Sequence, residues 1–381
     1  MGSIAPLPQL QPIGLEPSPE FDHFGCRVYV SFCLRRPTLT TNNISNWIEC
    51  YDPSNNTWSY ISLIPGIIES HILKGFAMVS LQDSIYIIGG RLCYEEMVHV
   101  SDELAELVDV EVEVLSSVLR YSVRTNRWST CATLQTPPRW DFACTVCDNK
   151  IYVAGGQSTS SSARGIPSAE VYDPTLDKWS SLPSMSTSRY KCAGVTWNGK
   201  VHMIGGYDKR LDSGCGIPFI VEQSSVEVYE PKTGRWELMA RMWQLDVPSN
   251  QILALDDGRL LSSGDCLMPW KGYIMAYDPE FNLWDTVPGS LQKTLSSAVA
   301  MSNVDDGRWP PIQPLYVTIA PIGTCLYFLV GYWASGDLPR TVSMVHMFDT
   351  SPYAECWRSF EPVEEDGEKE FCSHCCVIQL S

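Results

Sequence analysis

Histidines, the commonest ligands of transition metals in proteins, are few and scattered in this chain of 381 residues. The six of them stand at His23, His71, His99, His202, His346 and His374. Histidine-based metal sites usually draw two ligands from one short stretch of chain. The sequence therefore predicts no metal centre of that kind, and we expect no cofactor.

Two cysteine pairs have the C-x-x-C spacing of structural zinc sites: Cys144 with Cys147, and Cys372 with Cys375. Both pairs lie in apolar runs that we expect to form strands, where residues three apart point to opposite faces of the sheet. We therefore predict buried thiols there. The 15 cysteines are an odd number and follow no secretory signal, which indicates a reducing compartment, the cytoplasm or the nucleus.

Other signatures of catalysis, nucleic-acid binding and membrane binding are missing from the sequence. It has no G-x-S-x-G nucleophile elbow and no glycine loop that opens a helix around a phosphate. Its 44 acidic against 27 basic residues give a net charge of −17, which repels a phosphate backbone or an anionic membrane. No apolar run reaches the ~20 residues of a membrane span. We expect a soluble protein that is not an enzyme and binds neither nucleic acid nor membrane.

One phrase recurs along the chain and predicts a hairpin at each copy. It reads ECYDPSNNTWSYI at 49–61, AEVYDPTLDKWSSLP at 169–183, VEVYEPKTGRWELM at 226–239 and MAYDPEFNLWDTV at 275–287, with degenerate copies at 119–131 and 346–360. The aromatic residue and the tryptophan are seven residues apart in five copies and nine apart in the sixth. The Asp-Pro or Glu-Pro pair and the polar residues between them favour a tight turn joining two antiparallel strands.

Apolar strands that end in small residues precede these hairpins. They are IYIIGG (85–90), IYVAGG (151–156), VHMIGG (201–206), LLSSGD (260–265) and LYFLVGY (326–332), and each follows a further predicted strand. One unit is thus four strands, a to d, with glycines after b and a tryptophan in d. This pattern resembles the kelch repeat, and the set of six resembles a kelch β-propeller of the galactose oxidase superfamily. The resemblance implies an all-β, six-bladed propeller over residues 26–381.

The two ends of the chain are expected to meet in the first blade. CRVYVSF (26–32) is a predicted strand b with no strand a before it, while FCSHCCVIQL (371–380) is a predicted strand a with no strand b after it. We predict that this C-terminal strand completes the first blade, which removes open sheet edges. Residues 1–25 then form an irregular or disordered N-terminal tail.

The resemblance also raises two metal chemistries. Galactose oxidase binds copper through tyrosines and histidines, a set that the scattered histidines here do not reproduce. Plant nitrile-specifier proteins are kelch propellers with an iron site of the form E-xxx-D-xxx-H, and this chain has Asp366-xxx-Glu370-xxx-His374. The two acids are interchanged, and His374 falls in a predicted strand. A metal-dependent small-molecule enzyme of the specifier kind is therefore the alternative function.

Large variation in loop length falls on one face of the predicted propeller. The b–c loops at 33–46, 91–117, 157–168, 207–225, 265–273 and 331–342, and the d–a connection at 288–314, all emerge there. Loops on a rigid scaffold commonly carry function, and tryptophan, tyrosine and arginine dominate binding hot spots. Candidate partner-binding residues on this face are Arg139, Trp140, Arg189, Tyr190, Tyr207, Trp243, Trp270, Trp309 and Trp333. The alternative is that the aromatics anchor their own loops and the arginines brace neighbouring ones.

The insert in the second unit is strongly acidic. Eight acids and no Lys or Arg lie between Arg91 and Arg120. Its core, VDVEVEV, alternates strictly, which predicts an extended segment with valines on one side and carboxylates on the other. Such a run is a solvated loop or, in the functional interpretation, an acidic arm for a basic partner. The arm would consist of Glu103, Glu106, Asp109, Glu111 and Glu113.

The function that the resemblance implies is a non-enzymatic adaptor that binds a protein partner through this face. Many kelch proteins recognise substrates for ubiquitin ligases, and plant kelch propellers commonly follow an F-box. The roughly 25 residues before the first predicted strand are too few for that helical domain, and no BTB-like region is expected. A role with ubiquitin-ligase components would then need another surface or another chain.

Overall fold

A computed structural model describes residues 25–34, 45–68, 70–101, 104–159, 164–212, 218–222, 224–243, 252–263, 274–290, 314–334, 340–351 and 357–380. Every regular element in these ranges is a β-strand. The prediction of an all-β fold of the propeller class is confirmed. The predicted tail at 1–25 lies outside the described residues except for Gly25. Within the described ranges, no helix is long and apolar enough to cross a membrane.

Six antiparallel sheets of four or five strands, here called sheets 1 to 6, follow the order of the chain. Sheet 1 contains β1 (Cys26–Leu34), β2 (Trp47–Asp52), β3 (Thr57–Leu63), β30 (Lys369–Phe371) and β31 (Cys376–Gln379). Sheet 2 contains β5 (Ala77–Leu81), β6 (Ser84–Ile88), β9 (Val118–Ser122) and β10 (Arg127–Cys131). Sheet 3 contains β11 (Ala143–Cys147), β12 (Lys150–Ala154), β13 (Ala169–Asp173) and β14 (Lys178–Leu182).

The second half of the chain repeats this plan. Sheet 4 contains β15 (Ala193–Trp197), β16 (Lys200–Ile204), β19 (Val226–Glu230) and β20 (Arg235–Met239). Sheet 5 contains β21 (Ile252–Ala254), β22 (Leu260–Ser263), β23 (Ile274–Asp278) and β24 (Leu283–Thr286). Sheet 6 contains β25 (Pro314–Ile322), β26 (Cys325–Ala334), β27 (Arg340–Asp349), β28 (Trp357–Ser359) and β29 (Val363–Asp366).

Two smaller sheets are built from strands inserted between b and c of their units, and the first of them also includes β4 from the d–a connection. β4 (Ile72–Lys74), β7 (Arg91–Ser101) and β8 (Leu104–Val114) form a three-stranded sheet beside sheet 2. β17 (Tyr207–Asp212) and β18 (Pro218–Glu222) form a two-stranded ribbon in the fourth unit. The sequence places both segments in b–c loops, and the structure shows that parts of these loops are themselves strands.

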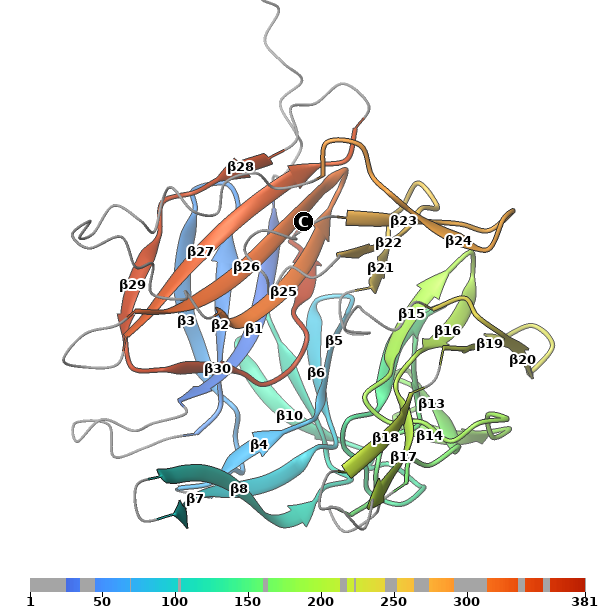
Figure 1. The fold of residues 1–381 in the computed structure, drawn as a ribbon, viewed down its shortest axis with the longest axis horizontal. Coiled ribbons are helices and arrows are strands. Elements are labelled where there is room, and N and C mark those ends of the chain that lie inside the picture. Colours follow the sequence, from blue (N-terminus) through green and yellow to red (C-terminus); the bar gives the residue numbers. More distant parts are fainter. Residues whose placement is uncertain are drawn as a thin grey trace, which may run out of the picture.

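The apolar core lies between the sheets. Each consecutive pair of sheets shares one cluster of buried side chains, and a further cluster joins sheet 6 to sheet 1. In that last cluster, Val30 and Tyr51 of sheet 1 pack with Tyr327 of sheet 6. Figure 1 shows the sheets following one another around the molecule, from β1 to β25 and back to β1. Burial of apolar surface between sheets is the main stabilising term in such a fold.

The aromatic–tryptophan hairpins of the repeat align as cross-strand pairs. The paired rings lie directly opposite each other, with centroids 5.0–5.3 Å apart: Tyr51–Trp58, Tyr121–Trp128, Tyr172–Trp179, Tyr229–Trp236, Tyr277–Trp284 and Phe348–Trp357. Five of these indoles also donate a hydrogen bond to the preceding sheet or its following loop, as Trp179 Nε1 does to Ala132 O at 2.8 Å. Each pair therefore ties one sheet to its neighbour.

The glycine pair after strand b allows close approach of the next unit. Gly156 N donates to Arg189 O at 2.8 Å, and Gly155 has a φ of +74°. A Cβ on Gly155 would come within 2.5 Å of the Arg189 carbonyl oxygen. Only glycine accepts both the backbone conformation and the contact.

The C-terminal chain pairs with the first strand, but as two short strands instead of the single predicted one. β31 pairs with β1 from Cys26↔Gln379 to Tyr29↔Cys376, and β30 pairs with β1 from Phe32↔Phe371 to Leu34↔Lys369. Between them, Ser373 Oγ donates to Phe76 O of the segment entering sheet 2 at 3.0 Å. Cys375 N donates to Thr318 Oγ1 of sheet 6 at 3.3 Å. The interruption thus bonds the chain end to both neighbouring sheets.

We predict that deleting residues 371–381 abolishes cooperative thermal unfolding, because the deletion exposes the edge of β1 and the core on either side. A milder test is Ile378→Ala, since this side chain is 2% exposed and belongs to the cluster between sheets 1 and 2. The change should lower the free energy of unfolding by about 2–5 kcal/mol. Gln379→Ala, at an exposed neighbouring position, is the matched control and should change it by less than ~0.5 kcal/mol. An unchanged transition after the deletion would contradict this account of how the ends meet.

Two histidines are buried among apolar groups. His202 in β16 and His346 in β27 are each 3% exposed. Burial lowers the pKa of both imidazoles from 6.5 to about 4, although the Lys200 carbonyl, 3.1 Å from Nδ1 of His202, partly opposes this at His202. Both therefore stay neutral in the folded protein at pH values where the unfolded chain protonates them.

Stability should fall as the pH drops from 6.5 to 4. In that window the unfolded chain binds protons at these two histidines and the folded protein does not, so each destabilises the fold by up to ~3 kcal/mol at the acid end. Denaturant titrations of the wild type and of the His202→Asn/His346→Asn variant at pH 7.5 and 4.5 measure the effect. The variant should lose less stability on acidification, and equal losses would refute the assignment.

Candidate functional site

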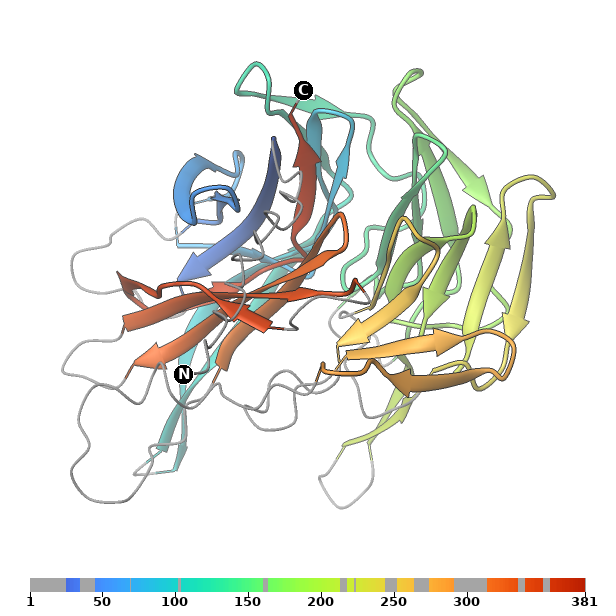
Figure 2. The same ribbon diagram turned by 90° about the horizontal axis from the view of Figure 1, so that it is seen from above.

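The candidate site is the end of the molecule where the b–c and d–a connections emerge, here called the insert face. Both inserted sheets lie there: β7 with β8, and β17 with β18, project to the same side in both views (Figures 1 and 2). Neighbouring connections also pair with each other. Isolated bridges join Trp140 to Gln157 and Tyr190 to Tyr207. The face is thus built from strands and paired loops on a ring of sheets.

β7 and β8 are here called the acidic ribbon. Their side chains point alternately to an inner and an outer face of this ribbon. Glu95 stands opposite Asp109, and Cys93 opposite Glu111, so these share the inner face. Tyr94 stands opposite Val110 on the outer face. The predicted extended segment, with valines and carboxylates on opposite sides, is confirmed over residues 108–111. A register shift between Leu92 and Cys93 then moves one carboxylate, Glu113, to the outer face.

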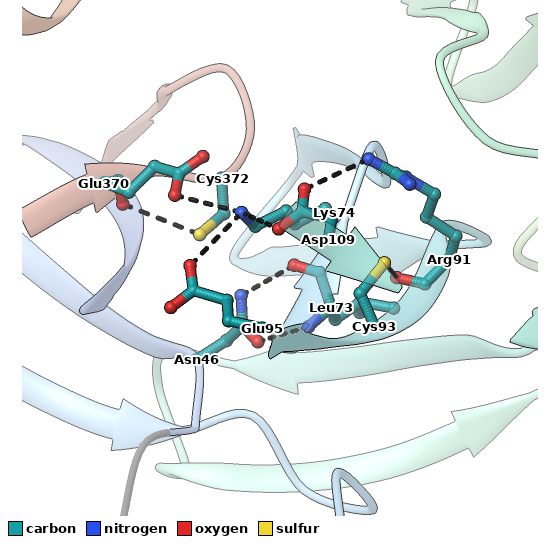
Figure 3. A network of polar contacts seen from close by, with 9 residues as sticks. All are labelled: Asn46, Leu73, Lys74, Arg91, Cys93, Glu95, Asp109, Glu370 and Cys372. Carbon is teal, nitrogen blue, oxygen red and sulfur yellow. Dashed lines mark hydrogen bonds and ion pairs between the residues drawn. The ribbon is translucent and has the colours of Figure 1, made fainter. Parts of the chain in front are cut away.

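Lys74 of β4 holds the inner face of the acidic ribbon. Its ammonium donates to Asp109 at 2.8 Å and to Glu370 of β30 at 3.0 Å, and it lies 3.8 Å from Glu95 (Figure 3). Arg91 adds a second cation, 3.2 Å from Asp109. Burial alone lowers the pKa of Lys74, but the carboxylates of Glu370 and Asp109 outweigh it and raise the pKa above its ordinary value. The network joins the ribbon to the strand that pairs with β1.

The proposed acidic arm is therefore only partly available to a partner. Asp109 is engaged by Lys74 and Arg91, which corrects its assignment as a free contact. Glu111 is half-buried on the inner face, and Glu113 is exposed on the outer face. Glu103 and the side chain of Glu106 lie outside the described residues. Sequence alternation alone did not reveal that Glu95 and Asp109 face the cations Lys74 and Arg91.

The two candidate arginines are interior residues, which corrects their prediction as partner contacts. Arg139 and Arg189 are both 0% exposed. Arg139 donates to Ser168 O at 3.0 Å and lies 3.3 Å from Glu170, and Arg189 donates to Gly205 O at 3.0 Å. Burial lowers the pKa of Arg139 to about 10, against the opposing effect of Glu170. They brace the connections of their own units, the alternative role that the sequence left open.

The candidate aromatic residues separate into interior and surface positions. Trp243 is 6% exposed and packs on Trp284 with ring centroids 5.8 Å apart, so its assignment as a contact residue is also corrected. Tyr190, at 7% exposure, packs on half-buried Tyr207 at 5.6 Å. The structure therefore brings together Tyr190 and Tyr207, two of the predicted partner-binding residues.

The remaining candidate tryptophans differ in their surroundings. Half-buried Trp140 is covered by Arg91, whose guanidinium lies 4.4 Å from its ring centroid. Trp333 at the end of β26 is 44% exposed. Trp270 and Trp309 lie outside the described residues.

A central cavity of about 920 Å³ runs along the innermost strands. Lys74, Asp141, Lys191 and Glu370 line it where the innermost strands begin, on the insert face, and His374 and Cys375 line it further along β30 and β31. Lys191 N donates to Asp141 O at 2.7 Å, and Asp141 N donates to Gly75 O at 2.8 Å, so backbone bonds link three units around this opening. The opening is polar and of mixed charge.

Among the described side chains, the residues of the metal alternative form no set of metal ligands. Glu370 is committed to Lys74, and the described residues contain no group of three His, Cys, Asp or Glu side chains placed to hold a metal. Of the C-x-x-C cysteines, Cys147 and Cys372 are buried and Cys144 and Cys375 half-buried, and all four are free thiols. Burial raises the pKa of Cys375 to about 11, which makes it a poor thiolate ligand.

Sequence reasoning missed a set of buried glutamates that position the insert face. Glu49, Glu170 and Glu227 each stand two residues before the repeat tyrosine. Glu170 and Glu227 are 0% exposed and accept backbone hydrogen bonds from Thr136 N at 3.1 Å and Thr187 N at 2.9 Å. Glu49 accepts from Lys369 at 2.7 Å. The signal was in the repeat, as an acid at a fixed position in three copies.

Recurrent four-stranded sheets, paired aromatics and glycine-ended strands place the fold in the class of the kelch β-propellers. The kelch motif matches residues 37–62 and 138–186. An F-box/kelch-repeat protein of Arabidopsis thaliana is 32% identical over 205 residues, 54% of this chain and 48% of the relative. The F-box/kelch-repeat protein SKIP30 of the same plant is 25% identical over 261 residues, 68% of this chain and 62% of the relative. Kelch-like protein 23 of Homo sapiens is 26% identical over 197 residues, 51% of this chain and 28% of the relative. Each match spans less than two thirds of the relative's own length.

Arg139→Met should destabilise the protein without removing a contact surface. The change leaves the carboxylate of Glu170 buried without its cation, which costs about 3–5 kcal/mol in unfolding free energy. Arg124→Met is the matched control because that side chain is 73% exposed, and it should change stability by less than ~0.5 kcal/mol. Chemical denaturation measures both. Equal stability of the two variants would show that the Arg139 network does not brace the fold.

Proposed function

We propose that this protein is a non-enzymatic adaptor that binds a protein partner through the insert face, with recognition of substrates for a ubiquitin ligase as its cellular role. The observation that carries the proposal is that both inserted sheets project from one face of a ring whose sheets are joined by buried clusters. A rigid scaffold with structured inserts binds without a large ordering cost, which favours protein recognition.

The chemistry of the insert face supports protein recognition over catalysis. Exposed aromatic side chains such as Tyr94, at 37%, and Trp333, at 44%, come from the same face as charged groups such as Lys191. Aromatic anchors with a polar surround are typical of protein interfaces. The net charge of −17 favours a protein partner with a basic surface over nucleic acid.

The ubiquitin-ligase role rests on the relatives. The Arabidopsis relatives are named F-box/kelch-repeat proteins, and another relative in Danio rerio is named for kelch repeats with a BTB domain. The described cysteines are free thiols, which supports the cytoplasm or nucleus as the compartment where this adaptor acts.

Affinity capture with an insert-face variant tests the proposal. Tyr94→Ala, Lys191→Ala and Trp333→Ala together remove exposed groups from this face and leave the buried networks in place. The variant should lose at least tenfold in the recovery of specific partners, including any ubiquitin-ligase subunits, measured by quantitative mass spectrometry against the wild type. Truncation of central aromatic contacts commonly costs 2 kcal/mol or more in binding, which corresponds to such a loss.

The matched control changes exposed apolar residues on the opposite face. Leu176 and Phe281 lie in c–d turns and are 70% and 66% exposed, so Leu176→Ala/Phe281→Ala should leave the capture unchanged. If only the control variant loses partners, the binding surface has been assigned to the wrong face. Purified protein that turns over a small molecule with a bound metal would support the enzyme alternative instead.

A further inference from the structure

The acidic ribbon ends in a long strand edge that has no partner among the described residues. The strand order of its sheet is β4-β7-β8, so β8 (Leu104–Val114) forms one edge. The sequence of β8, LAELVDVEVEV, contains no lysine, proline or glycine. Lysine and proline commonly protect an exposed edge against pairing with another chain, whereas the acids that β8 carries oppose chiefly a strand of like charge. The edge therefore offers a row of backbone donors and acceptors to a further strand.

The outer face next to this edge is apolar and open. Val108 is 43% exposed, Val112 is 51% exposed, and Tyr94 and Val98 on the adjacent strand are 37% and 41% exposed. The register places Val108, Val110, Tyr94 and Glu96 on the same side of the ribbon, and the bulge adds Val112 and Glu113 near its base. Large apolar side chains grouped on a projecting ribbon are a feature of interaction sites in soluble proteins.

The ribbon next to the edge carries more acids than cations. Among the described side chains, Glu95, Asp109 and Glu111 on the inner face and Glu96 and Glu113 on the outer face stand against two cations, Arg91 and Lys74. The ribbon therefore keeps a surplus of negative charge after its own ion pairs are made. Asp109 and Glu111 alternate with Val108 and Val110 along the strand that forms the edge.

We propose that β8 binds an extended basic segment of a partner protein by strand addition, a refinement that rests on the adaptor function proposed above. An added strand places alternate side chains on the two faces of the sheet. One row meets Val108 and Val110, and the other runs along the side of Asp109 and Glu111, where the surplus negative charge of the ribbon attracts it. The partner segment therefore alternates apolar residues with lysine or arginine.

A second copy of this chain fits the edge less well than a basic segment does. Two β8 strands paired edge to edge bring Asp109, Glu111 and Glu113 of one copy against the same acids of the other. Like charges opposite each other across strands are destabilising. Charge complementarity thus selects a basic segment and opposes self-association through β8.

Fluorescence anisotropy with a labelled decapeptide of alternating valine and lysine tests the proposal on the full chain. The wild type should bind it saturably. A peptide of the same composition in two blocks, five valines followed by five lysines, should bind at least tenfold more weakly. An alternating peptide N-methylated at every residue has no backbone N–H to donate along either edge and should also lose at least tenfold. Equal binding of the alternating and block peptides would overturn the proposal, and so would the absence of binding by the wild type at 1 mM peptide.

Edge variants identify β8 as the site. Val112→Lys places a cation on the exposed outer face beside the edge and should weaken binding of the alternating peptide at least tenfold. Leu283→Lys in β24 makes the same change at a 54% exposed edge-strand position elsewhere and should leave binding unchanged. Both variants should keep the thermal transition of the wild type because the replaced side chains are exposed. Unchanged affinity in Val112→Lys would refute strand addition at β8.

The outcome is separable from that of the adaptor proposal. If the peptide fails to bind while the insert-face variant still loses captured partners, strand addition is wrong and the adaptor function stands. If the peptide binds through β8 while the insert-face variant loses no partner, strand addition is supported and the assignment of the adaptor face is wrong.

Discussion

The contact between the paired aromatics of one sheet and the preceding unit is the interaction on which the rest of this structure depends. In each hairpin an aromatic ring faces the tryptophan of the next strand at 5.0–5.3 Å, and in five hairpins the indole N–H bonds to the preceding unit. An aromatic pair contributes about 0.5–1.5 kcal/mol beyond its burial, and a hydrogen bond about as much. One such contact adds little to the free energy of folding, but its repetition in every unit fixes the angle between successive sheets. The inserts can then vary without disturbing that angle.

The same geometry explains the tyrosine at the first position of four of the six hairpins. The hydroxyl groups of Tyr51, Tyr121, Tyr172 and Tyr277 donate to a side-chain oxygen five residues later, at 2.7–3.1 Å. The acceptor residue has a positive φ, for example +52° at Asn56 and +46° at Asp177. Asparagine and aspartate tolerate this conformation better than most residues. The turn and the aromatic pair are therefore fixed together by one side chain.

The repeat made much of the fold predictable, because its chemistry is local. Hairpins, glycine-ended strands and an all-β fold follow from spacings of a few residues. The location of buried charged residues does not follow from such spacings, because it depends on contacts between units. Arg139 and Arg189 look like surface arginines in loops, yet each lies under carbonyl groups of its own unit. The bulge that moves Glu113 to the outer face follows from a pairing with Leu92 across the ribbon, and VDVEVEV itself contains no sign of it.

Lys74 connects two segments that lie far apart in the sequence, the insert of the second unit and the end of the chain. Its ammonium is shared between Asp109 of the acidic ribbon and Glu370 of the strand that pairs with β1. Its side chain is 12% exposed, so the ammonium is largely desolvated, and loss of either carboxylate would leave this buried charge poorly compensated. The base of the ribbon is therefore held in a fixed position relative to the pairing of the chain ends. Because Asp109 is held there on the inner face, the ribbon presents its apolar outer face and its open edge to the solvent.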